Sequence, residues 1–272
     1  MAQAGARAKV PVAEVALDAY RTVFGRLSLV LDLAWLPLLL LLAVTILPGY
    51  LRLYRDLPGL PPWSGDAFGL GFETILEALV GLLCLTAFAV RWYQALLFVG
   101  GRRVPPGIFL GAWLRFLLYM LLLYLAASAL LTAVLLADLE RAPAYLAPLA
   151  GIAVLALWLA PVRCALVFPA AACGEPLALA AAWRAMGGNT WRLLAAALLA
   201  SVPIAFVAVT MLGGIAAALH LDSAGDTPPP LGFFLLGGVI GSCANFLVVA
   251  LGTSVLAAFY RRIALTPGSD RP

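Results

Sequence analysis

Three charged residues lie within or at the ends of long apolar runs, where an ionised side chain is costly. Asp32 follows the start of the first run, and Arg91 and Arg163 are each followed by further apolar residues. Charged groups at membrane depth usually pair with one another or mark a functional position. The positions predict an intramembrane ion pair between Asp32 and either Arg91 or Arg163. The alternative is that both arginines extend to the lipid headgroups.

Arginines at one face of a membrane protein can also hold phosphate. A guanidinium group matches the geometry of phosphate oxygens and keeps its charge at all relevant pH values. Arg91, Arg163 and Arg192 are therefore candidate contacts for an anionic lipid headgroup. No nucleophile or base stands beside them in the sequence, so we expect no catalytic residue here.

Two carboxylates, Glu73 and Glu77, are spaced four residues apart and so share one face of a helix. They could bind a cation or form the mouth of a proton path. An ordinary hydrated helix start explains them equally simply, and it is the interpretation we favour. Acidic residues near a helix N-terminus also complement the helix dipole.

A small-residue face is expected near the C-terminus, where Gly237, Gly241 and Asn245 follow one another at steps of four. Glycines at this spacing let helices approach closely in membranes, and asparagine can hydrogen-bond across the same interface. The pattern favours helix packing, within the bundle or between subunits, over ligand binding.

Metal and cofactor chemistry lack a recognisable motif. The chain has one histidine, His220, and four cysteines that are far apart within apolar runs: Cys84, Cys164, Cys173 and Cys243. Without a C-x-x-C pair or a histidine cluster, structural thiols are the better interpretation. We expect no metal, no cofactor and no enzymatic activity.

Composition places all these residues in a membrane protein. Charged residues make up 11% of the 272 residues, hydrophobic residues 64%, and the mean hydropathy is +1.05. A water-soluble domain of this length cannot bury so much apolar surface. The net charge of +4 is carried by residues that flank the apolar runs. These residues predict contacts with anionic phospholipids rather than with nucleic acid.

The apolar runs predict a single all-α membrane domain, a polytopic bundle of six transmembrane helices over residues 1–272. A spanning helix needs about 20 apolar residues. The predicted spans lie at 27–47, 70–90, 116–136, 145–162, 193–212 and 231–251.

Two further segments are predicted as interfacial amphipathic helices. In Val12–Arg26, apolar residues recur at helical spacing on one face. The second is Pro176–Met186, after which Asn189 stands where an N-cap for the next span belongs. Such helices either cover the bundle as connectors, the interpretation we favour, or sense lipid and dock a partner.

Orientation follows from the distribution of charge. Of the 17 basic residues, 14 lie in the N-terminal segment, in the second-to-third and fourth-to-fifth connections, and at the C-terminus. The alternate connections carry mostly acids. The positive-inside rule therefore places both termini in the cytoplasm. No cleavage site closely follows the first apolar run, which we expect to stay in the membrane.

Four segments resemble a known group of proteins. They are the runs Ala165–Ala172 (ALVFPAAA), Ala182–Arg184 (AWR), Gly188–Leu194 (GNTWRLL) and Trp92–Leu97 (WYQALL). Together with the six-span layout, they resemble uncharacterised bacterial inner-membrane proteins related to the membrane domain of glycerophosphoryl diester phosphodiesterases. The resemblance implies a location in the bacterial inner membrane and a domain sometimes fused to lipid-related enzymes. We expect no counterpart of the catalytic barrel of those enzymes in these 272 residues, so no catalytic residue carries over.

The leading hypothesis is a non-enzymatic scaffold, regulatory or lipid-interacting protein of the inner membrane. Its expected partners are membrane lipids and either another membrane protein or a second copy of the chain. The alternative is a transporter of a small solute or an ion. Its main support is the set of charged residues Asp32, Glu73, Glu77, Arg91 and Arg163. Similar Arg-Leu or Arg-Phe starts of the first, third and fifth spans add to it, since some transporters contain such internal repeats. The charge bias and the Leu/Ala-rich composition alone also explain these similar starts.

Overall fold

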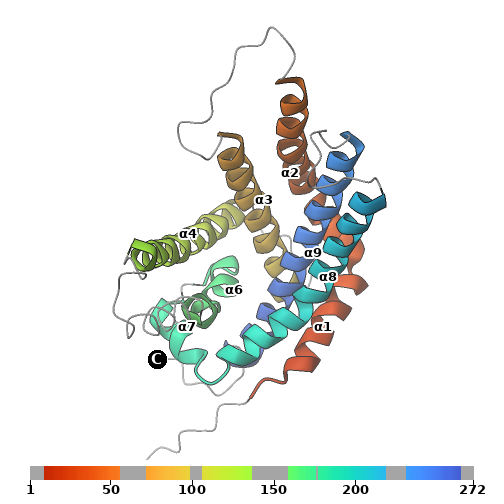
Figure 1. Cartoon of the computed structure of the whole chain (residues 1–272). Coiled ribbons are helices and arrows are strands. Elements are labelled where there is room, and N and C mark those ends of the chain that lie inside the picture. The colour runs from red at the N-terminus through yellow and green to blue at the C-terminus, as the bar shows by residue number, and fades with distance from the viewer. Residues whose placement is uncertain are drawn as a thin grey trace, which may run out of the picture.

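The computed structural model describes residues 9–55, 72–98, 106–136, 159–175, 177–218 and 231–264. These residues contain helices and no strand, which confirms the all-α prediction (Figure 1). The helices are α1 (Val12–Gly25), α2 (Leu27–Arg55), α3 (Phe72–Leu97), α4 (Pro106–Leu136), α6 (Val167–Ala172), α7 (Leu179–Ala185), α8 (Thr190–Ala218) and α9 (Leu231–Ala264).

Five helices in the described ranges are long and apolar enough to cross a membrane. They agree with five of the predicted spans and support a multi-pass membrane protein. The apolar stretches are Leu27–Ile46, Ile75–Leu97, Phe109–Ala126, Thr190–Ala218 and Leu235–Ile263. Most of the sixth predicted span, 145–162, lies outside the described residues.

Several helices are longer than the hydropathy pattern predicts. α3 continues past Arg91 to Leu97, and α4 begins at Pro106 instead of 116. The reason is that an arginine does not end a helix. Beyond Arg91, the side chains of Trp92 and Tyr93 are buried in the core, so packing favours continuation of the helix.

α1 has the predicted boundaries to within one residue, and its apolar face is covered by protein. Val15 and Val23 are fully buried, and the helix packs along α8 and α9 (Figure 1). These contacts fit the connector that covers the bundle. Leu17 and Phe24 lie exposed, with 56% and 48% of their surface accessible.

Polar contacts fix the start and the middle of α1 to α8. The Val10 N–H donates to Asn189 Oδ1 at 3.3 Å, and the Tyr20 hydroxyl donates to the Ala200 carbonyl at 2.7 Å. α8 begins at Thr190, as the predicted cap position requires. The Asn189 side chain, however, accepts a hydrogen bond from the chain entering α1, so it connects two segments 179 residues apart.

A turn after α6 joins three long helices. Gln94 of α3 donates to the Ala172 carbonyl at 3.1 Å, and Arg115 of α4 donates to the Gly174 carbonyl at 3.3 Å. The Tyr260 hydroxyl of α9 donates to Glu175 Oε2 at 2.8 Å. Gly174 has a φ of +79°, a left-handed conformation that glycine adopts without strain. The turn therefore holds α3, α4 and α9 in place.

Cys173, in this turn and outside the five apolar stretches, is expected to be a slow nucleophile. Burial raises the pKa of its thiol to about 11, and the Glu175 carboxylate adds to the shift. The thiolate is the reactive form, so alkylation near neutral pH should be on the order of tenfold slower than for an ordinary thiol. Iodoacetamide labelling of a variant that retains only Cys173 should still accelerate above about pH 9.

The Glu175→Gln variant provides the control for this labelling. Removal of the negative charge favours the thiolate, so the pKa of Cys173 should fall and its labelling curve should shift to lower pH. An unchanged curve would contradict the contribution of Glu175.

Candidate functional site

The structure does not form the predicted ion pair between Asp32 and an arginine. Asp32 is exposed on α2, and within the described ranges no ion pair joins it to Arg91 or Arg163. The guanidinium carbon of Arg91 lies 4.0 Å from the ring centre of Phe109, and that of Arg163 lies 4.4 Å from the ring of Trp183. Each arginine is thus attracted by an aromatic face.

The three arginines predicted to contact lipid headgroups are used in protein contacts and do not meet at one cavity. Arg192 donates to the Val10 carbonyl at 2.9 Å and so helps to hold α1. Arg163 Nε is buried without a hydrogen-bond partner, and Arg91 is exposed beside its aromatic ring.

The acidic pair at the start of α3 is described in part. Glu77 is exposed and accepts a hydrogen bond of 3.1 Å from the Thr45 hydroxyl of α2. The Glu73 side chain lies outside the described part of the structure. The contact with Thr45 ties the two helices together near the end opposite α1.

The predicted small-residue face of α9 divides into two parts. At Gly237, an added Cβ would lie 3.6 Å from a methyl group of Leu212 in α8. At Gly241, an added Cβ would meet nothing within 4 Å, and Asn245 is exposed. Helix packing within the described chain therefore explains Gly237. Gly241 and Asn245 face outward, where a partner or a second copy stays a prediction.

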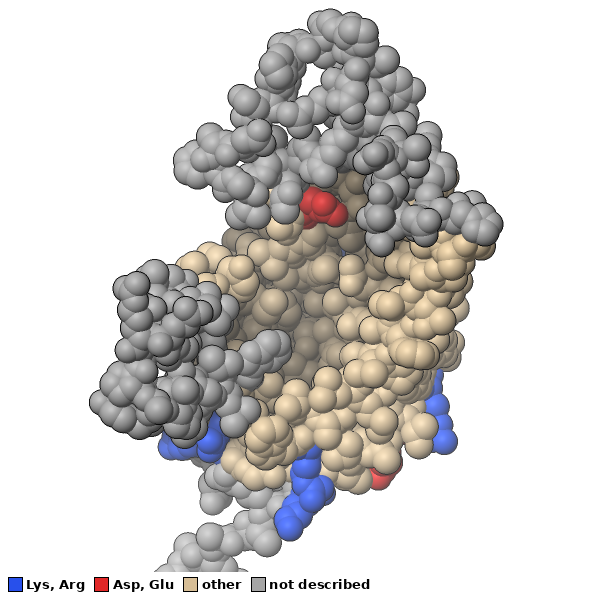
Figure 2. All heavy atoms as spheres, in the orientation of Figure 1, with Lys and Arg blue, Asp and Glu red and all other residues tan. Residues whose placement is uncertain are grey.

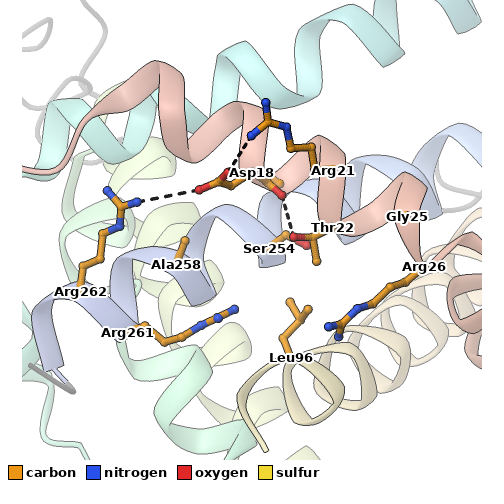
Figure 3. Close-up of a pocket in the computed structure, with 11 residues that line it drawn as sticks. Asp18, Arg21, Thr22, Gly25, Arg26, Leu96, Ser254, Ala258, Arg261 and Arg262 are labelled. Carbon is orange, nitrogen blue, oxygen red and sulfur yellow. Dashed lines mark hydrogen bonds and ion pairs between the residues drawn. The ribbon is translucent and has the colours of Figure 1, made fainter. Parts of the chain in front are cut away.

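A cavity of about 520 Å³ lies where the junction of α1 and α2 meets the ends of α3 and α9 (Figure 3). This volume is within the range of small-molecule sites in proteins. Four arginines and a single carboxylate are among its lining residues. The lining consists of Asp18, Ala19, Arg21, Thr22, Gly25, Arg26, Leu96, Ser254, Ala258, Arg261 and Arg262.

Two of the four arginines are engaged by acids of α1. Arg262 hydrogen-bonds Glu14 Oε1 at 2.6 Å and lies 3.9 Å from Asp18 Oδ2. Arg21 lies 3.7 Å from Asp18 Oδ1. The contacts of Arg262 join α1 to the last turn of α9, whereas the Arg21–Asp18 pair lies within α1. Together they neutralise part of the positive charge at the cavity.

The other two arginines, Arg26 and Arg261, form no ion pair with a described residue. Their guanidinium groups extend toward one another across Leu96 (Figure 3). Both side chains are exposed, so a ligand can reach them. Unpaired guanidinium groups on two walls of one cavity make a site for a phosphate or carboxylate group.

The ends of the apolar helices place this cavity at a boundary between apolar and polar surface. One apolar stretch begins directly after Arg26, another ends beside Leu96, and the last ends beyond Arg261. Figure 2 shows basic side chains at the lower end of the visible face, beneath a broad uncharged surface. The cavity thus lies near the ends of three of the apolar stretches.

In the sequence, Arg26, Arg261 and Arg262 indicate only the orientation of the chain in the membrane, as part of the basic residues near its two ends. The available signal was that basic residues flank both the first and the last apolar run. That signal indicates a site only once the two runs are known to be neighbours, as α2 and α9 are in the structure.

The cavity can bind an anion, and its described lining offers arginines for contact and one carboxylate that pairs with them. No group of three or more histidine, cysteine or acidic side chains suited to a metal occurs in the described ranges. Comparison of the chain with protein-family models, curated proteins and solved structures gave no match.

Proposed function

We propose that this protein is a non-enzymatic, lipid-interacting membrane protein that binds the anionic headgroup of a phospholipid. The observation that carries the proposal is a pair of guanidinium groups, Arg26 and Arg261, that form no ion pair with a described residue and face one cavity of about 520 Å³ at the ends of apolar helices. A lipid headgroup supplies the negative charge at this depth, and its acyl chains can lie along the apolar helix surfaces nearby.

The proposed location is the bacterial inner membrane, with both termini in the cytoplasm. The excess of basic residues in alternate connections supports this orientation. The cavity would then open toward the cytoplasmic leaflet, whose anionic lipids attract basic segments. The relation to membrane domains of glycerophosphoryl diester phosphodiesterases stays a prediction.

Native mass spectrometry of the protein extracted with its lipids tests the proposal. We expect the unaltered protein to retain an anionic phospholipid, and the double variant Arg26→Gln and Arg261→Gln to lose it. Arg184→Gln is the matched control. It removes one exposed arginine of α7 outside the cavity lining, so it should leave the bound lipid in place.

Two other outcomes would contradict the proposed site. If the double variant keeps its lipid while Arg91→Gln with Arg163→Gln loses it, the headgroup contacts are the arginines chosen from the sequence. If no variant retains lipid selectively and reconstituted vesicles accumulate a small anion, the transporter alternative replaces lipid binding.

A further inference from the structure

We infer that the cavity prefers a headgroup ending in a phosphomonoester, as in phosphatidate, over one in which the phosphate is a diester. This inference rests on the proposed function and specifies the chemical class of its ligand. It comes from the balance of charge at the cavity and from the positions of its two unpaired arginines.

The charge balance favours a ligand with two negative charges. The cavity is lined by four arginines and Asp18, and Glu14 pairs with Arg262 from outside the lining. These six described groups leave an excess of two positive charges, carried by side chains that no described acid neutralises. A phosphomonoester carries a charge of about −1.5 to −2 at neutral pH, whereas a phosphodiester carries about −1.

The geometry points the same way. Arg26 extends from the junction of α1 and α2, and Arg261 extends from α9, so the two guanidinium groups approach a bound phosphate from different sides (Figure 3). A terminal phosphate presents three free oxygens, enough to accept hydrogen bonds from both groups at once. A diester has only two free oxygens, and its second substituent must occupy the space between the walls.

The pH dependence of lipid binding separates the effect of the ligand's charge from the effect of the protein's charge. The groups facing the ligand are Arg21, Arg26, Arg261, Arg262 and Asp18, with Glu14 behind Arg262. The arginines keep their charge, while a phosphomonoester takes up a proton near a pKa of about 6 and then carries one charge. Acidification should therefore reduce the preference.

The experiment compares binding of purified protein to phosphatidylcholine nanodiscs that contain equal small fractions of phosphatidate or phosphatidylglycerol. At about pH 7.5 we expect phosphatidate to bind about tenfold more tightly, as expected for one additional charge contact. At about pH 5.5, where about a quarter of the phosphatidate is still doubly charged, the ratio should fall to about threefold. Asp18→Asn should strengthen binding of both lipids and leave the change with pH in place.

Each alternative outcome has a distinct meaning. Equal binding of both lipids at about pH 7.5, with both lost in the Arg26→Gln and Arg261→Gln variant, would overturn the preference and leave the proposed function standing. Binding no stronger than to pure phosphatidylcholine would overturn both. If inorganic phosphate or glycerol 3-phosphate displaces phosphatidate completely at equal concentration, a soluble phosphate is the ligand, and the lipid source is wrong.

Discussion

Replacement of Trp92 by alanine is expected to destabilise the protein by about 3–5 kcal/mol, the cost of removing a large aromatic side chain from a packed core. Trp92 of α3 is fully buried and stacks on Phe88 with ring centres 6.5 Å apart. Its indole N–H donates to the Ala250 carbonyl at 3.1 Å and to Ser254 Oγ at 2.9 Å, both in α9. The side chain thus connects two membrane-spanning helices through packing and polar contacts together.

Trp92→Phe separates these two contributions. It retains an aromatic ring beside Phe88 and removes the donor. The Ser254 hydroxyl already donates to the Ala250 carbonyl at 2.7 Å, so that acceptor stays satisfied without the indole. The expected cost is about 1 kcal/mol plus a small packing loss.

Unfolding of the purified protein in mixed micelles of increasing sodium dodecyl sulfate, followed by circular dichroism, measures both Trp92 variants. The alanine variant should unfold at clearly lower detergent fraction than the phenylalanine variant. Equal losses in the two variants would show that the hydrogen bonds, rather than packing, stabilise this contact.

Introduction of a charge at Val15 should release α1 from the bundle. Val15 is fully buried between α1 and its neighbours α8 and α9, and an unpaired buried carboxylate costs about 3–5 kcal/mol. Leu17→Asp is the matched control, because Leu17 lies on the same helix with 56% of its surface exposed. It adds the same charge to α1 and should have little effect on the packing of α1 against α8 and α9.

Limited proteolysis within α1 reports its release. We expect the Val15→Asp variant to be cleaved much faster than the unaltered protein. The Leu17→Asp variant should be cleaved at about the rate of the unaltered protein. Release of α1 should also weaken the proposed headgroup binding, since Arg26 is then displaced from the cavity. If Leu17→Asp is cleaved as fast as Val15→Asp, the outer face of α1 contributes as much as the buried face to its position.

Much of the helical architecture could be predicted because hydropathy and helical periodicity are properties of single segments. The apolar runs located five helices suited to crossing a membrane, and the spacing of apolar residues located α1 and the residues on its buried face. The ends of helices were less predictable. α3 continues beyond Arg91 because the buried residues that follow still gain from packing in the core.

Whether lipid or protein covers an apolar helix face depends on helices that are far away in the chain. An apolar face has the same sequence pattern whether lipid or protein covers it, so the pattern of α1 left both open. Its buried valines pack on α8 and α9, which fits the favoured connector. Likewise, an ion pair was predicted between Asp32 and either Arg91 or Arg163. Each arginine instead lies over an aromatic ring of another segment.

The sequence by itself determined that this is a helical, multi-pass membrane protein with an apolar face on α1, because those features arise from local composition and spacing. Only the tertiary structure decided which arginines form ion pairs with described acids and which do not. Glu14 engages Arg262 across 248 residues of sequence, while Arg26 and Arg261 are left facing the same cavity. Charge pairing is a property of distances in space, and those distances are set by the packing of α1 against α9.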